Sequence, residues 1–182
     1  MEAARILAID PASNGFGFAV LEGPTALIDW GVKHASGDQN RKYLEQAAKL
    51  IARYQPEVLV VEDTRAKGSR RRSRACELIE NLLAPASAQY LRTWRVSRRK
   101  VQLSFSKSGP ATKRQVAVAL TERFPELEPH LPPVRKPWIS EDERMSIFDA
   151  MAFALTFYQE MESRKPRHSG EVEFSFQTRA QE

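Results

Sequence analysis

The sequence contains little of what disulfide-rich, zinc-binding or membrane proteins need. Its single cysteine, Cys76, excludes an internal disulfide and any cysteine-rich zinc site. Its three histidines, His34, His130 and His168, are isolated from one another, mostly in loop contexts, and we expect them at the surface. No apolar run reaches the roughly 18 residues that a membrane span requires. These absences exclude a transmembrane protein and a small disulfide-stapled one.

Length and composition indicate one globular domain. The chain has 182 residues, of which 42% are hydrophobic and 28% charged, which is typical of globular proteins. The N-terminus lacks a basic region followed by an apolar core, so we expect no signal peptide and a cytoplasmic location. We assign 1–162 to the domain and 163–182 to a polar tail. Residues 172–176 alternate in polarity, so the tail is either an edge strand or a disordered end that orders on a partner.

Positive charge is modest in total but concentrated in clusters. The 28 basic and 23 acidic residues give a net charge of 28 − 23 = +5. Clustering favours a polyanionic partner, nucleic acid first, although a solvated basic face is the alternative for any one cluster. The candidate nucleic-acid-binding residues are Arg65, Lys67, Arg70, Arg71, Arg72, Arg74, Arg98, Arg99, Lys107 and Arg114. We expect the densest segment, 65–74, to be an arm that grips phosphate.

The order of apolar patterns predicts an α/β fold. Turn signals at Asn14-Gly15 and Glu22-Gly23-Pro24 separate three strands that form a meander. The expected elements are strands at 4–10, 15–21 and 26–33, a helix at 39–54, a strand at 57–62, a helix at 71–91, extended segments at 94–96 and 101–105, and helices at 113–124 and 140–160. This order predicts a mixed sheet, with an antiparallel meander and parallel strands, covered by helices on both faces.

Capping signals and prolines set the expected boundaries in the second half. Thr112 is a plausible N-cap for the helix at 113–124, and Ser140 with Glu143 fits a capping box for the last helix. Five of the eleven prolines lie in 125–139, which we expect to be an irregular loop. The three tryptophans, Trp30, Trp94 and Trp138, are expected in the core or an interface.

Three acids stand where a metal site needs them. Asp10 ends an apolar strand before a turn of small residues, and Glu62 ends the buried strand that begins at Val58. Asp149 lies inside an apolar helical stretch, where an unpaired carboxylate is very costly, so it requires a basic partner, a metal or access to water. Hydrolysis of a phosphodiester can use two Mg²⁺ ions about 4 Å apart, held by a few carboxylates. Lys113 could then contact a phosphate.

Four stretches together resemble the RuvC family of Holliday-junction resolvases, in the RNase H-like superfamily. Each is similar to a family motif, and they follow in the family's order: Ala8–Ser13, Val60–Glu62, Ala111–Val116 and Asp149–Leu155. The resemblance implies an RNase H-like fold and a Mg²⁺-dependent endodeoxyribonuclease of the crossover-junction type. It further implies two Mg²⁺ ions, with Mn²⁺ as a substitute, a homodimer, and branched DNA as the substrate in recombination or repair.

The resemblance also assigns the site residues. Asp10, Glu62 and Asp149 match three of the family's four metal ligands, and the fourth position is occupied by Ser146. A serine can hold a metal-bound water but is a poor primary ligand. Asp142 is a candidate replacement, although seven helical residues, about 10 Å, separate it from Asp149. The catalytic candidates are Asp10, Glu62, Asp149 and Lys113.

A second departure leaves the substrate open. The family often places an aromatic wedge after its second acid, whereas this chain continues with the charged segment 63–72. A nucleic-acid-binding protein with weakened catalysis is therefore one alternative, and a nuclease of this fold acting on flaps or RNA is another. A sugar-kinase-like phosphotransferase opens with a similar hairpin, but that architecture needs two such domains and a far longer chain.

Overall fold

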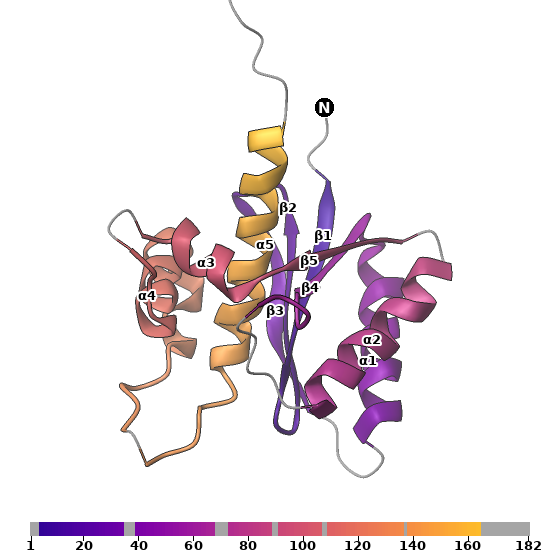
Figure 1. The fold of residues 1–182 in the computed structure, drawn as a ribbon, viewed down its shortest axis with the longest axis horizontal. Helices are drawn as coiled ribbons and strands as arrows, with labels where there is room; N and C mark the ends of the chain where they lie inside the picture. Colours follow the sequence, from indigo (N-terminus) through magenta and orange to yellow (C-terminus); the bar gives the residue numbers. More distant parts are fainter. Residues whose placement is uncertain are drawn as a thin grey trace, which may run out of the picture.

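The computed structural model describes residues 4–34, 39–67, 73–88, 91–106, 109–136 and 138–164 (Figure 1). One five-stranded sheet lies at its centre, with strands in the order β3-β2-β1-β4-β5. β1 pairs antiparallel with β2 and parallel with β4. The strands are β1 (Arg5–Ala12), β2 (Gly15–Glu22), β3 (Ala26–His34), β4 (Val58–Glu62) and β5 (Arg92–Val96). The expected mixed sheet, a meander extended by parallel strands, is confirmed.

Helices cover both faces of this sheet, as expected (Figure 1). α1 (Gln39–Tyr54) and α2 (Ser73–Ala88) pack on one face, and α5 (Met145–Arg164) crosses the other. Beside α5 lie α3 (Arg98–Ser104), α4 (Lys113–Arg123) and the 3₁₀ helix η1 (Pro125–His130). In the described part of the chain, no helix combines the length and the apolar character that crossing a membrane requires.

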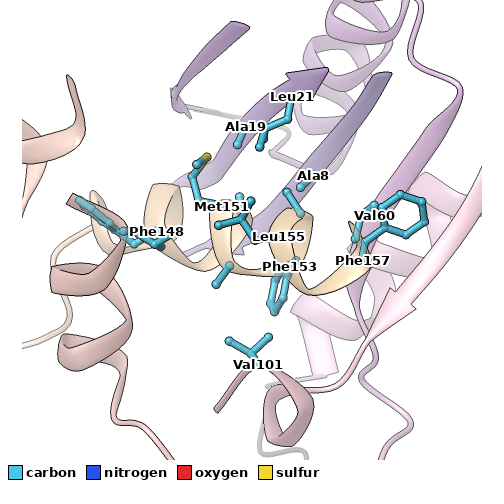
Figure 2. Packing of buried hydrophobic residues seen from close by; sticks show 14 of the residues in the cluster. Ala8, Ala19, Leu21, Val60, Val101, Phe148, Met151, Phe153, Leu155 and Phe157 are labelled. Atoms are coloured by element: carbon cyan, nitrogen blue, oxygen red, sulfur yellow. The ribbon is translucent and has the colours of Figure 1, made fainter. Parts of the chain in front are cut away.

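The two-residue period of the strands divides the core into two halves. On β1, Ile6 and Ala8 face α5, whereas Leu7 and Ile9 face α1 and α2. Figure 2 shows the α5 side, where Met151 and Leu155 lie over the sheet and Phe153 points toward Val101 of α3. These side chains are buried, so α5 is held firmly over the sheet. Even-numbered residues at the end of β1 therefore point toward α5.

Two helices in the second half differ from the sequence prediction. Residues 101–104, expected to be extended, instead belong to α3, because the Ser97 side chain caps this helix by accepting from the Lys100 backbone N–H. α5 begins at Met145, so the capping box at Ser140 is wrong. The Asp142 carboxylate instead accepts from the Arg144 backbone N–H and stabilises a turn there.

The proline-rich segment and the tryptophans also bring corrections. Residues 125–130 form η1 rather than irregular loop, because Pro125 suits a helix start and Leu127 is buried. Trp30 and Trp94 pack against the core as expected, whereas Trp138 is 79% exposed. The helix expected at 71–91 is observed as Ser73–Ala88.

Tyr158 links α5 to the start of the sheet and gives a stability prediction. Its hydroxyl donates to Ala4 O at 2.6 Å and accepts from the Gly23 backbone N–H at 2.9 Å. Tyr158→Phe should destabilise the fold by about 1–3 kcal/mol, because it leaves these partly buried backbone groups without this partner. Urea unfolding at pH 8 measures the difference.

The pH dependence provides a second test of the same contact. Burial raises the pKa of Tyr158, so the folded state keeps the phenol proton at a pH where the unfolded chain loses it. The contribution of Tyr158 to the free energy of unfolding is therefore fully present below the unfolded pKa of about 10, and it decreases as the pH rises above that value. Wild type should lose more unfolding free energy than Tyr158→Phe between pH 8 and 11. Equal losses would contradict the assignment.

Candidate active site

Asp10 and Glu62 lie side by side at the ends of two parallel strands. Ile9 of β1 is in register with Val61 of β4, so the residues that follow them reach the same edge of the sheet. Both carboxylates point to the α5 side, like Ala8 and Val60 before them. Asp10 is 2% exposed and Glu62 is 1% exposed. Two buried acids on rigid strands therefore face the helix that carries the third.

Asp149 is brought to this edge by the first turns of α5. It is 6% exposed, within the fully buried stretch of the helix. The close approach of α5 to β2 depends on Gly17, which is the register partner of Asp10. A Cβ atom at Gly17 would lie 2.2 Å from the carbonyl carbon of Ser146. A glycine beside the first acid thus allows the helix to present the third.

Arg98 lies among the three acids and contacts all of them. Its Nη1 donates to Asp149 Oδ1 at 2.6 Å, and its Nη2 reaches Asp10 Oδ1 at 3.4 Å. Its Nε and Nη2 each donate to a Glu62 oxygen at 3.2 Å. The guanidinium also lies 5.5 Å from the centre of the Phe153 ring. Arg98 is the first residue of α3, so the Ser97 cap places it at the site.

The electrostatics of the cluster favour the charged forms of Arg98 and Asp149. Burial disfavours the charged form of Arg98, but the charges of Asp149, Asp10 and Glu62 outweigh it and raise the Arg98 pKa. Burial likewise opposes ionisation of Asp149, and the charges of Arg98 and Lys113 nevertheless hold its pKa below the ordinary value. The acids at this edge are therefore compensated by protein cations.

Lys113 supplies the second cation and connects Asp149 to an acid that sequence reasoning missed. Its Nζ donates to Asp149 Oδ2 at 2.9 Å and to both Glu141 carboxylate oxygens at 2.8 Å. The Thr112–Gln115 capping box fixes the start of α4, and with it Lys113. No pattern in the sequence indicates Glu141, because its position depends on the irregular segment before α5.

The candidates for a fourth ligand have other contacts. Asp142 forms an ion pair with Arg144 at 2.7 Å, and the hydrogen bond from Arg144 lowers its pKa. Asp142 also lines a pocket next to β3 together with His34 and His130. Ser146 is buried, and its hydroxyl donates to Glu143 O at 2.5 Å. Asp142 and Ser146 thus have protein partners of their own.

The donor set suits a hard divalent ion. Mg²⁺ prefers carboxylate oxygens, and three buried carboxylates face a single cation here. Among the described residues, no group of three acidic, histidine or cysteine side chains is spaced closely enough to hold a metal as it stands. The carboxylates are instead spaced around the guanidinium of Arg98. Their chemistry fits a metal, and their present separation fits Arg98.

The structure separates the candidate nucleic-acid-binding residues into distinct roles. Arg65 pairs with Glu80 at 2.9 Å, and Arg114 donates to the carbonyl of Pro132, so these two also stabilise the fold. Arg98 lies in the acid cluster. The exposed members are Arg65, Lys67, Arg74 and Arg99. Four members lie outside the described residues: Arg70, Arg71, Arg72 and Lys107.

An exposed apolar and basic loop leads into the site. Trp138 is 79% exposed and Val134 is 78% exposed. Lys136 Nζ lies 5.8 Å from the centre of the Trp138 ring, and Arg135 donates to Ile139 O at 2.6 Å. The same chain segment continues to the acid that pairs with Lys113. In Figure 1 the loop projects from the end of the molecule at which α5 begins.

Comparison with known proteins identifies the fold. No protein-family model matches the chain, and no curated protein matches it. A structure of RuvC from Thermus thermophilus is similar, with a TM-score of 0.62, 20% identity, and coverage of 87% of this chain and 96% of that one.

Two further structures are similar to the chain. One is T. thermophilus RuvC in complex with a Holliday junction substrate, with a TM-score of 0.61, 18% identity, and coverage of 87% of this chain and 96% of that one. The other is the yeast mitochondrial Holliday junction resolvase Ydc2, with a TM-score of 0.56, 14% identity, and coverage of 89% of this chain and 82% of that one. The chain therefore has the RNase H-like fold of these structures, over nearly the whole length of RuvC.

Proposed function

We propose that this protein is a divalent-metal-dependent endonuclease that hydrolyses phosphodiester bonds in branched DNA. One observation carries the proposal: buried carboxylates from β1, β4 and α5 converge at the ends of parallel strands. The similar structures support it, because RuvC was seen with a Holliday junction substrate and Ydc2 is a Holliday junction resolvase.

The residues of the chain have separate roles in this proposal. Asp10, Glu62 and Asp149 would hold Mg²⁺ or Mn²⁺, and the ions supply an activated water and stabilise the leaving oxygen. Lys113 lies next to Asp149 and carries a compact positive charge, which suits contact with a phosphate. The basic residues along 65–74 and Arg99 would attract the DNA backbone without reading its sequence.

A cleavage assay tests the proposal directly. Equal amounts of a four-way junction, a flap, a linear duplex and a single-stranded RNA are incubated with the protein and Mg²⁺ or Mn²⁺. We expect cleavage that requires the metal and is fastest on the junction. Cleavage of only the flap or only the RNA would support the nuclease activity and contradict the four-way junction as its substrate. Metal-independent binding without cleavage of any substrate would indicate the alternative, a nucleic-acid-binding protein on this fold.

The alternative is favoured by one feature of the site. Protein cations already neutralise the acids, and Ser146 stands where the resemblance implies a fourth carboxylate. A protein that had lost catalysis would still bind nucleic acid through its basic residues. The retention of three buried acids, each costly to bury, favours catalysis over this alternative.

A homodimer is part of the proposal, because symmetric cleavage of a junction needs two active sites related by a two-fold axis. The sequence predicts the helix at 71–91 as its interface, because that helix has more apolar surface than one sheet face needs. This reason is wrong, since Leu78, Ile79 and Leu82 of α2 are buried in the protein's own core. Sedimentation at micromolar concentration, with and without junction DNA, tests the dimer.

Trp138 gives a prediction about the substrate. An exposed indole next to a lysine side chain is suited to stacking on an unpaired base. Trp138→Ala should weaken binding to DNA with unpaired bases by about 1–3 kcal/mol, roughly 5- to 150-fold. Binding to a fully paired duplex should change little. Trp138→Phe is the matched control, because it keeps an aromatic face, and equal losses on both DNAs would contradict stacking.

A further inference from the structure

Arg98 occupies a position that a metal ion would need. Its three side-chain nitrogens lie between 2.6 and 3.4 Å from oxygens of Asp10, Glu62 and Asp149. Mg²⁺ binds its oxygen ligands at about 2.0–2.1 Å, so an ion shared by these acids would have to lie between them. The guanidinium fills that space. Steric exclusion alone prevents a metal and Arg98 from bridging the same carboxylates.

Charge gives the same result. At formal charge, Asp10, Glu62, Asp149 and Glu141 contribute −4. Arg98 and Lys113 contribute +2, so the group carries −4 + 2 = −2. Two divalent ions would change this to −2 + 4 = +2 if both protein cations remained. Repulsion between a guanidinium and a divalent ion at contact distance is strong in a site shielded from water. Departure of Arg98 would lower that excess.

The position of Arg98 also allows it to leave. Its side chain is 25% exposed, whereas those of Asp10 and Glu62 are at most 3% exposed. It extends from the first residue of a short helix, and its neighbour Arg99 is exposed. A long side chain at the edge of the cluster can turn outward by changes of rotamer, without moving the strands or α5.

We propose that Arg98 is an internal counter-cation, which bridges the three acids in the metal-free protein and has to leave them before a divalent ion binds. The residue thereby compensates the buried acids in the metal-free protein and lowers the metal affinity of the site. This inference rests on the proposed metal-dependent function.

The test measures metal binding by the full chain without DNA. Calorimetric titration with Mn²⁺ compares wild type with Arg98→Gln, which removes the charge and keeps much of the length. Arg99→Gln is the matched control, since it removes a neighbouring exposed arginine. We expect Arg98→Gln to bind Mn²⁺ at least about tenfold more tightly than wild type, and Arg99→Gln to match wild type. Without metal, Arg98→Gln should melt at a lower temperature, and Mn²⁺ should raise that temperature more than in wild type.

Asp10→Asn separates failure of this inference from failure of the proposed function. Equal Mn²⁺ affinity in wild type and Arg98→Gln, with weaker binding by Asp10→Asn, would overturn the role of Arg98 and leave the metal site intact. Mn²⁺ binding by none of the proteins, or equal binding by all of them, would overturn the metal site and the inference with it.

A second measurement uses wild type and remains valid if Arg98→Gln does not fold. The Nε–H signal of Arg98 is followed by NMR during addition of Mg²⁺ and is assigned with Arg98→Lys. The metal-free protein should show a protected signal, because Nε donates to Glu62. Mg²⁺ should abolish that protection. A signal that stays protected while Mg²⁺ saturates the site would overturn the proposal.

Discussion

Asp10→Asn should abolish cleavage while leaving the protein folded and able to bind DNA. The amide replaces a carboxylate that faces Glu62 and Asp149 across one cation, so it removes a metal ligand at the centre of the site. Loss of a ligand for metal-ion catalysis should reduce the rate by about 10³-fold or more, since metal stabilisation of the transition state is worth several kcal/mol. Single-turnover cleavage of a junction in Mg²⁺ measures the effect.

DNA binding should be unchanged or tighter in this variant, because a negative charge next to phosphate is removed. The fold should persist, since Arg98 keeps its contacts with Glu62 and Asp149. Asp63→Asn is a matched control: it makes the same chemical change one residue beyond Glu62, at a carboxylate that accepts from the Arg65 backbone N–H. Asp10→Asn that cleaves at the wild-type rate would falsify the metal-site assignment.

The sheet and the convergence of the acids follow from local sequence patterns. Val58–Val61 is apolar throughout and ends in Glu62, and the strand before Asp10 is similar. Such runs identify buried strands, and the carboxyl ends of parallel neighbours meet at one edge. The proximity of Asp10 and Glu62 could therefore be predicted from the sequence alone. The register of Ile9 with Val61 confirms the geometry.

The start of α5 could not be predicted in the same way. Ser140 with Glu143 satisfies the capping pattern, yet the helix begins five residues after Ser140, at Met145. Tertiary contacts decide this boundary: Glu143 accepts from Asn14 at 2.6 Å, and Glu141 pairs with Lys113 at 2.8 Å. Both partners are distant in the sequence. A local capping pattern therefore cannot reveal these contacts, which compete with it in setting where the helix begins.

The sequence also does not indicate which arginine contacts the three acids. Arg98 and Arg99 are adjacent and chemically identical, and both were assigned to phosphate binding. The structure places Arg98 among acids 36 and 88 residues away in the sequence and leaves Arg99 exposed. The Ser97 cap fixes the direction of the helix and selects one of the two. A helix of seven residues is too short for periodicity to reveal which side faces the core.

Gly17→Ala should be the most damaging small substitution in the sheet. Its new Cβ would lie 2.2 Å from the carbonyl carbon and 2.4 Å from the carbonyl oxygen of Ser146, so β2 or α5 has to move. Overpacking of a rigid core typically costs 1–3 kcal/mol, and a collision with backbone places this variant at about 3 kcal/mol or more. Urea unfolding measures the loss. Thr25→Ala, at an exposed turn, should stay within about 0.5 kcal/mol of wild type.

The same displacement should reduce catalysis beyond its effect on stability, because α5 carries Asp149 and β2 pairs with the strand that carries Asp10. A shift of about 1 Å in catalytic geometry can cost about 10²-fold in rate. Cleavage is measured at a temperature where unfolding curves show the variant to be folded. Adding Ser146→Ala should not restore activity, because the collision includes the backbone carbonyl, which this substitution leaves in place. Full recovery in the double variant would instead show that the serine hydroxyl is the obstruction. The position of Asp149 would then not depend on the backbone contact between β2 and α5.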